Sequence, residues 1–158
     1  MVSVAFNPLD SDILAAGDQS EGIGVLDVRN GKLLRVLRWG SAHVVAFSPD
    51  GQTLVSAGFG GFGLGAPAPA LVSWDFRTGA PLWSTGGLVY SIAFSPDGRV
   101  LAATGLTALQ LWDSTQHKLL GTFDISAAAV FHPRQRMLAT TFWDSIRLWK
   151  LRIDSASH

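Results

Sequence analysis

The sequence predicts an all-β protein built from four repeated units of short antiparallel strands. The hexamer AFSPDG occurs at 46–51 and again 47 residues later at 93–98, which indicates an internal repeat. Between such segments the chain consists of apolar or alternating runs of four to six residues, such as YSIAF, VLAAT and KLLGTF. Runs of this length between turn residues are typical of strands and are too short for helices.

One phenylalanine marks each unit. The four are 41, 47 and 37 residues apart, and a proline follows each of them after two residues. A second register of VLD, SWD, LWD and LWK ends at 27, 75, 113 and 150. Because the period continues through the chain, we expect a single domain over 1–153, with units at about 2–40, 42–86, 88–124 and 126–153 and a disordered tail at 154–158.

The SPDG segment explains why the hexamer recurs. Proline holds φ at about −65°, aspartate favours turn geometry through side-chain hydrogen bonds, and glycine adopts the positive φ at which other side chains clash. Each hexamer therefore predicts the end of a first strand followed by a hairpin turn. It recurs because each unit must turn the same corner.

Four strands in about 40 residues are typical of a β-propeller blade. On the residues quoted above, the chain resembles the WD-repeat β-propeller family, with a secondary likeness to YVTN-type propeller repeats over 24–51. The resemblance covers residues 2 to about 153. It implies a fold more specifically than a function, because propellers host many unrelated tasks.

The resemblance also implies where the strands of each blade lie. First strands near 2–6, 43–47, 90–94 and 127–131 would line a central channel. Second strands would begin near Ile13, Leu54, Val100 and Met137, and third strands would end at Leu26, Trp74, Trp112 and Trp149. Fourth strands would cover 33–37, 80–84 and 119–123. We expect the last blade to lack its outer strand, since 150–158 contains neither a turn nor an apolar run.

The chain departs from the family at several positions. The Gly-His dipeptide between blades is missing, Leu26 replaces a tryptophan and Lys150 replaces an aspartate. The Asp-His-Ser/Thr-Trp network that locks blades in the family is therefore not expected to be complete. We expect structural roles for the repeat residues, which are Phe6, Phe47, Phe94, Phe131, Trp74, Asp75, Trp112, Asp113 and Trp149.

Ring closure poses a physical problem. A propeller normally closes with about four to eight blades, so that no blade face stays open. Four blades with the curvature of a seven-bladed ring, about 50° each, would cover little more than half a circle. We therefore expect a partial ring or half of an oligomeric ring. Two chains could form a homodimer that closes an eight-bladed ring, the chain could be part of a longer propeller, or four blades could close tightly.

The segment 59–70, FGGFGLGAPAPA, is the most individual part of the chain. Leu54 and Trp74 are 20 residues apart, whereas the corresponding spacing is 11 in each of the next two units. Family geometry places this connection on a face that often binds peptides. We expect an apolar patch for a partner there, formed by Trp39, Phe59, Phe62, Leu64 and Trp143. In the alternative interpretation, the aromatic side chains of a flexible loop fold back on the blade.

The sequence motifs predict no catalytic, cofactor-binding or metal-binding residue. The pattern G-x-G-x-x-G at 58–63 is followed at once by Ala-Pro-Ala-Pro, which would break the helix that a dinucleotide site needs. The four histidines are scattered, and neither H-E-x-x-H nor G-x-S-x-G occurs. The chain has no cysteine, so thiolate chemistry is excluded.

Composition limits the partners. Twelve basic and twelve acidic residues cancel, which disfavours nucleic acid or an anionic membrane as a partner. No apolar run approaches the roughly 20 residues that cross a bilayer, and MVSVAFNPLD is unlike a signal peptide, so we expect a cytoplasmic protein. A charged fraction of only 15% indicates surfaces that are meant to be covered.

These observations favour a protein- or peptide-binding scaffold of WD-repeat type, without catalytic activity and without a cofactor. Two alternatives stay open. One is a propeller enzyme or small-ligand binder whose channel site forms when the ring closes. The other is an architectural segment of a larger propeller.

Overall fold

The protein folds into β-sheets and turns. The structure is a computed structural model, and it describes residues 3–18, 22–38, 42–58, 70–106, 108–124, 128–142 and 144–151. Within these ranges fifteen strands form four separate antiparallel sheets, and no helix occurs. The predicted all-β fold of four antiparallel blades is confirmed.

Each sheet contains consecutive strands in chain order. The first sheet contains β1 (Val4–Phe6), β2 (Ile13–Gly17), β3 (Ile23–Asp27) and β4 (Lys32–Leu37), and the second contains β5 (Val44–Phe47), β6 (Thr53–Ala57), β7 (Leu71–Asp75) and β8 (Pro81–Thr85). The third contains β9 (Ser91–Phe94), β10 (Val100–Thr104), β11 (Leu109–Asp113) and β12 (Lys118–Phe123), and the fourth contains β13 (Ala129–Phe131), β14 (Met137–Phe142) and β15 (Ser145–Lys150).

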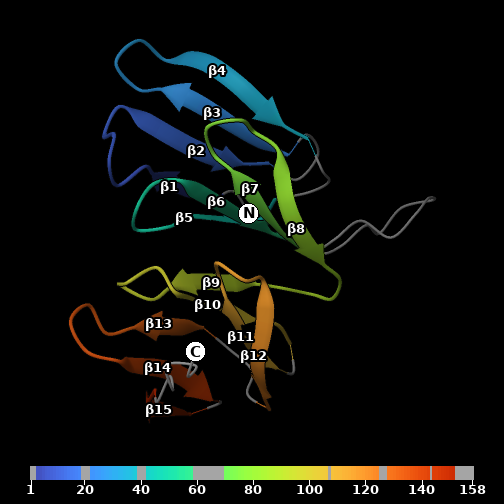
Figure 1. The fold of residues 1–158 in the computed structure, drawn as a ribbon, viewed down its shortest axis with the longest axis vertical. Coiled ribbons are helices and arrows are strands. Elements are labelled where there is room, and N and C mark those ends of the chain that lie inside the picture. Colours follow the sequence, from blue (N-terminus) through green and yellow to red (C-terminus); the bar gives the residue numbers. More distant parts are fainter. Residues whose placement is uncertain are drawn as a thin grey trace.

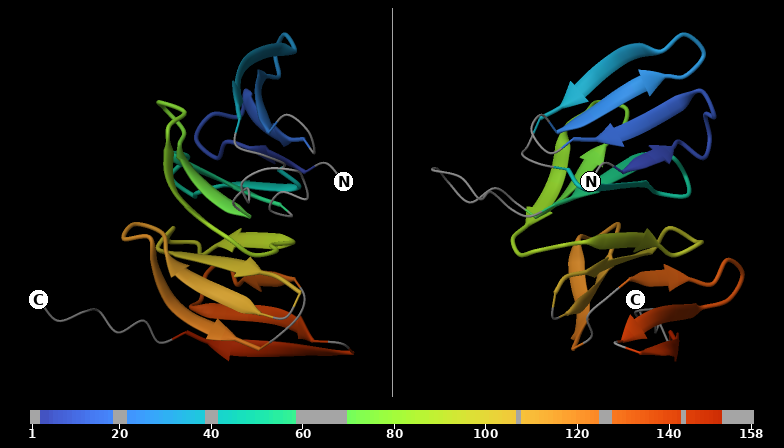
Figure 2. Two further views of the ribbon diagram at one scale, coloured as in Figure 1. Left: turned by 90° about the vertical axis from the view of Figure 1, so that its right-hand side faces the viewer. Right: turned by 180° about the vertical axis from the view of Figure 1, so that it is seen from behind.

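The four sheets stand face to face in a row that does not close. Figure 1 shows the first sheet (blue) and the fourth (red) at opposite ends of the long axis, with β1, β5, β9 and β13 following one another along one side. Both views of Figure 2 agree with this order. Among the described residues, β15 is the outermost strand of the fourth sheet. The sheets therefore form an open arc of blades.

The two faces of each sheet differ. Residues paired across neighbouring strands lie on the same face, so Phe47, Leu54 and Trp74 share one face of the second sheet. We call this the repeat face, because it carries the phenylalanine, leucine and tryptophan positions of the repeat. Val55 and Leu71 lie on the other side, which we call the reverse face.

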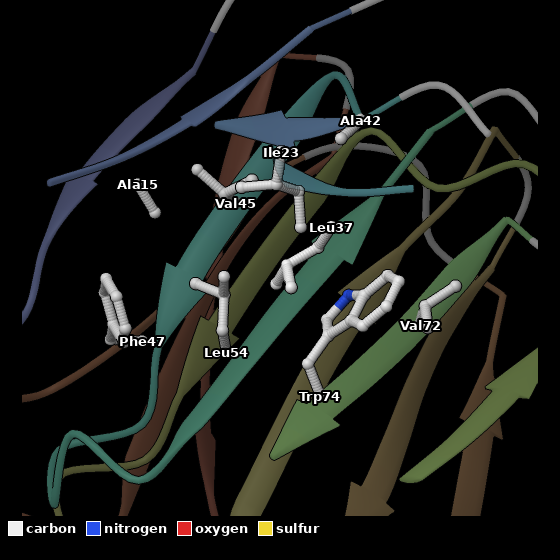
Figure 3. Packing of buried hydrophobic residues seen from close by; sticks show 9 residues of the cluster. All are labelled: Ala15, Ile23, Leu37, Ala42, Val45, Phe47, Leu54, Val72 and Trp74. Carbon is white, nitrogen blue, oxygen red and sulfur yellow. The ribbon is translucent and has the colours of Figure 1, made fainter. Parts of the chain in front are cut away.

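Three apolar clusters join the sheets, and all have the same polarity. Between the first two sheets, the repeat face of the second (Phe47, Leu54, Trp74) packs on Ala15 and Ile23 from the reverse face of the first (Figure 3). Leu101 and Ala103 of the third sheet meet the reverse face of the second in the same way. Phe131 and Leu138 of the fourth sheet pack on the reverse face of the third sheet. Each interface therefore pairs a repeat face with the reverse face before it.

This polarity leaves two different apolar faces open at the ends of the row. The first sheet exposes its repeat face, where 59% of Phe6 and 61% of Val4 are accessible to solvent. The fourth sheet exposes its reverse face, where 62% of Val130 and 66% of Leu148 are accessible. The prediction of an open ring with uncovered apolar faces is consistent with this arrangement.

The turn between the first and second strand of each sheet is organised by the residue after the repeat phenylalanine. Ser48 Oγ donates to Asp50 at 2.5 Å and accepts from the backbone N–H of Thr53 at 2.9 Å. Ser95 makes the same pair of bonds with Asp97 and Val100. The corresponding turns use the side chains of Asn7 and His132, which accept backbone N–H groups from the residues that follow them. Three side-chain types, Asn, Ser and His, thus organise the same turn in the four sheets.

The turn between the third and fourth strands depends on an aspartate in the three sheets that have both strands. Asp75 Oδ1 accepts the N–H of Thr78 at 2.7 Å, and Asp113 Oδ1 accepts that of Gln116 at 2.7 Å. Asp27 accepts backbone and side-chain N–H groups of Arg29. The aspartate of the repeat is therefore a turn residue in this chain.

We predict that acid destabilises the protein partly through these turns. The hydroxyl that Ser95 donates to Asp97, together with the N–H and charge of Arg99, lowers the pKa of Asp97 below 3.8. A lowered carboxylate pKa stabilises the fold above the pKa of the unfolded chain, and this contribution disappears as the pH falls through the folded value. The free energy of unfolding in urea should therefore fall between about pH 5 and pH 3.

In Asp97→Asn this decline should be shallower than in the parent protein. Asp124→Asn, at an exposed position after β12, serves as the control and should keep the parent slope. Equal slopes for Asp97→Asn and the parent would contradict the assignment.

Candidate partner-binding surfaces

On one side of the row, at one end of the strands, lie both the connections between second and third strands and the connections from one sheet to the next. In an antiparallel sheet of four strands, the connection from second to third strand leaves at the same edge as the connection to the next sheet. Accordingly, the N–H of Ala42 donates to the carbonyl of Asp18 at 2.8 Å, and that of Val89 donates to the carbonyl of Gly58 at 3.4 Å. We call this side, where the described residues 18, 22, 38, 42–43, 58, 70, 86–90, 105–106 and 108 lie, the loop edge.

Glycine allows the connections to approach each other closely. A Cβ atom on Gly17 would collide with the carbonyl oxygen of Ala42, and one on Gly105 would collide with that of Leu88. Both contacts are with backbone, which cannot move away as a flexible side chain could. The loop edge is therefore a fixed surface at these two places.

All five residues predicted to bind a partner lie outside the described residues. Trp39 falls between 38 and 42, Phe59, Phe62 and Leu64 fall between 58 and 70, and Trp143 falls between 142 and 144. The described ends of the longest of these segments are joined, since the N–H of Gly58 donates to the carbonyl of Ala70 at 2.8 Å. The apolar patch stays a prediction.

The described part of the loop edge contains an apolar pocket. Its volume is about 310 Å³, and it lies where the connection from the second to the third sheet passes β10 and β11. Leu106, 58% of which is accessible to solvent, and Leu88 lie beside Gly86, Gly87 and Gly105. Such a pocket can hold an apolar side chain. Sequence reasoning missed it, although Gly86-Gly87 at a unit boundary was a usable signal.

The tryptophans of the repeat differ in how their indole N–H is bonded. Trp74 Nε1 donates to Ser56 Oγ at 3.0 Å, and Trp149 Nε1 donates to Thr140 Oγ1 at 2.9 Å. Trp112 Nε1 is buried and has no hydrogen-bond partner among the described residues. The cause is in the sequence: Ala103 stands in β10 where Ser56 and Thr140 stand in β6 and β14.

These bonds bear on the network that the family resemblance implied. The hydroxyl-to-tryptophan step exists in the second and fourth sheets and is missing in the third. The sequence pattern of the Trp positions alone did not reveal this difference. The residues two positions after the second-strand leucines, at 56, 103 and 140, carry the signal for this difference.

The phenylalanine positions show the effect of the missing neighbour. Phe47 and Phe131 are buried in the clusters between sheets, and the ring of Phe47 meets Phe76 edge to face at 4.9 Å. Phe6, at the corresponding place in the first sheet, is mostly exposed. The same repeat residue is therefore core in one sheet and surface in another.

Arg29, in the turn after β3 of the first sheet, pairs with Asp12 at 3.4 Å and with Asp27 at 3.0 Å. Burial lowers the pKa of His43 and that of His117, which lie at the loop edge and in the turn after β11 respectively. The described part of the chain contains no group of three His, Cys, Asp or Glu side chains that could hold a metal ion. Among the same residues, no helix is long and apolar enough to span a membrane.

Stacked antiparallel sheets of three or four strands, each with a repeated Phe and Leu on one face, define a protein of propeller-blade architecture. Comparison with known families adds a specific match: residues 80–113, from the start of β8 to the end of β11, match the family described as WD domain, G-beta repeat. The match supports assigning the chain to the WD-repeat family, as its sequence resemblance predicted. A comparison with curated proteins found no significant match.

We predict that Ala103→Ser stabilises the protein. A serine hydroxyl at 103 would accept the indole N–H of Trp112, as Ser56 does for Trp74, and the free energy of unfolding should rise by about 1 kcal/mol. Ser56→Ala should lower it by about 1–3 kcal/mol, because it removes the hydroxyl that accepts the Trp74 N–H. Both changes can be measured by urea unfolding.

Ala102→Ser is the matched control, since Ala102 is buried in the same strand but faces the fourth sheet. Its hydroxyl has no indole to meet and should destabilise the fold. If Ala103→Ser destabilised the protein as much as Ala102→Ser, the unpaired N–H would not be the cause.

Proposed function

We propose that the chain is a protein- or peptide-binding scaffold of WD-repeat type that has no catalytic activity of its own. The observation that carries the proposal is the WD-repeat match over 80–113, which spans strands of two neighbouring sheets. The open arc supports it, because four packed sheets hold their connections on one edge. Binding residues on loops of a rigid scaffold are a common arrangement for recognition.

The partner would bind at the loop edge. The described pocket beside Leu88 and Leu106 offers an apolar contact on a surface that Gly105 fixes. We propose that further apolar anchors come from connections that are outside the described residues, namely from Trp39, Phe59, Phe62, Leu64 and Trp143. Tryptophan and other large apolar side chains commonly dominate binding energy at such surfaces.

We predict that partner capture depends on the segment 59–69. Replacing Phe59, Phe62 and Leu64 together by serine should reduce capture of a partner, identified by crosslinking and mass spectrometry, at least about tenfold, since three apolar anchors are lost. The matched control replaces Gly60, Gly61 and Gly63 by serine and keeps the apolar side chains. It should retain capture.

Unchanged capture by the triple apolar variant would contradict a role for this segment. Thermal unfolding of both variants should remain close to that of the parent, which separates a loss of binding from a loss of folding.

We further propose that two chains associate through their open faces. Each internal interface pairs a repeat face with a reverse face, and the two open faces are one of each kind, carried by Phe6 and Val4 on one sheet and by Leu148 and Val130 on the other. A second copy can cover both at once by forming two equal contacts about a twofold axis. This would close a ring of eight blades.

We predict that the purified chain has twice the 16.8 kDa mass of one copy in light scattering after size exclusion. Leu148→Asp should shift it toward a monomer, because it places a charge in the apolar contact. Leu9→Asp is the control: Leu9 is exposed in the turn after β1 and lies on neither open face. A parent protein that is monomeric at all concentrations would overturn the proposal.

A further inference from the structure

A second apolar pocket lies between the third and fourth sheets, at their outer strands. Its volume is about 380 Å³, which is within the range of small-ligand sites. Most of its wall is aliphatic or aromatic, and the lining residues that matter below are Leu111, Gly121, Phe123, Leu138, Trp149 and Lys150. Neither the loop edge nor the open end faces include this pocket.

Comparison of the equivalent positions in the first three sheets shows where a side chain is missing at this pocket. In each of the first three sheets the third and fourth strands slip in register, and the pair just before the slip is Val25 with Arg35, Ser73 with Trp83, or Leu111 with Gly121. Arg35, Trp83 and Gly121 are therefore structural equivalents. Each stands on the reverse face of its sheet and faces the next sheet in the row.

The two side chains at this position fill their interfaces. The Trp83 ring lies 4.9 Å from the ring of Trp112, at an interplanar angle of 32°, and 5.6 Å from that of His117. The Arg35 guanidinium lies 5.1 Å from the ring centre of Phe76 and donates to the carbonyl of Arg77. In both interfaces a planar group covers an aromatic ring of the following sheet.

Gly121 places nothing in the third interface. Its nearest neighbour there is the ring of Phe123, which would lie 3.3 Å from an added Cβ atom, and Phe123 itself stands 5.8 Å from Trp149. The φ angle of Gly121 is not positive, so its backbone conformation is compatible with a side chain. The pocket is the space that Trp83 occupies in the interface before it.

The chemistry of the wall selects between the two kinds of planar group. No described residue that lines the pocket carries a carboxylate, and Lys150, which follows Trp149 in β15, lies on the opposite face of the fourth sheet. A guanidinium would lose hydration there without gaining an acceptor side chain. A neutral aromatic ring would bury apolar surface against Leu111 and Leu138 and pack near Trp149.

We propose that this pocket binds an aromatic side chain of indole size, carried by a partner polypeptide. The proposal rests on the proposed function, because it gives the scaffold a second contact with a partner on the outer side of the row. The ring of the partner takes the place that Trp83 takes in the preceding interface.

The test is a titration of the protein with a blocked Gly-Trp-Gly tripeptide, followed by NMR. Saturable shifts should appear at the amide of Gly121 and the indole N–H of Trp149, and contacts should be seen between the tripeptide ring and the methyl groups of Leu111 and Leu138. Blocked Gly-Leu-Gly and Gly-Arg-Gly should bind at least about tenfold more weakly, because neither presents a neutral ring.

Gly121→Trp fills the pocket from within and should abolish the saturable shifts. Thr115→Trp is the matched control, since Thr115 is exposed in the turn after β11 and lines neither apolar pocket, and it should bind as the parent does. Equal affinity for the three tripeptides, or undiminished binding to Gly121→Trp, would overturn the proposal. If Gly121→Trp does not fold, the contacts to Leu111 and Leu138 in the parent protein decide alone.

The two proposals fail separately. The variant in which serine replaces Phe59, Phe62 and Leu64 should keep tripeptide binding, because these residues do not line the pocket. If the tripeptide does not bind while partner capture still depends on that segment, the pocket proposal is wrong and the scaffold function stands.

Discussion

The face-to-face packing of amphipathic sheets is the constraint on which the rest of this structure depends. A sheet of three or four short strands has two faces, and in this chain both faces are apolar in every blade. A blade on its own would expose both faces to water, so each blade is stabilised by the sheet packed against it. The fixed pairing of a repeat face with a reverse face gives the stack its direction and leaves two unlike surfaces uncovered.

Variation within this scheme occurs at a few positions that the repeat does not hold constant. One is the hydroxyl of the second strand, present as Ser56 and Thr140 and replaced by Ala103. Another is the outer-strand position occupied by Arg35, Trp83 and Gly121. Both substitutions leave backbone hydrogen bonding intact. They change what fills the space between blades, which is how one interface acquires an unpaired N–H and another acquires a pocket.

The sequence predicted the fold well because its signals are local. Proline, aspartate and glycine at the first turn and the repeated phenylalanine placed the strands to within a few residues. The pocket was beyond its reach, because recognising Gly121 as a vacancy requires the register slip that aligns it with Trp83. The predicted apolar patch also escaped any structural test, since Phe59 and its partners lie outside the described residues.

Each hydrogen-bonded ladder lies within one unit of consecutive strands. Removing or inserting a whole unit would therefore break no ladder and would only exchange one apolar interface for another. The stability of such a chain is approximately a sum of terms for units and for their nearest-neighbour interfaces. Its length is then a variable that can change in steps of one blade, while the geometry of every remaining blade stays the same.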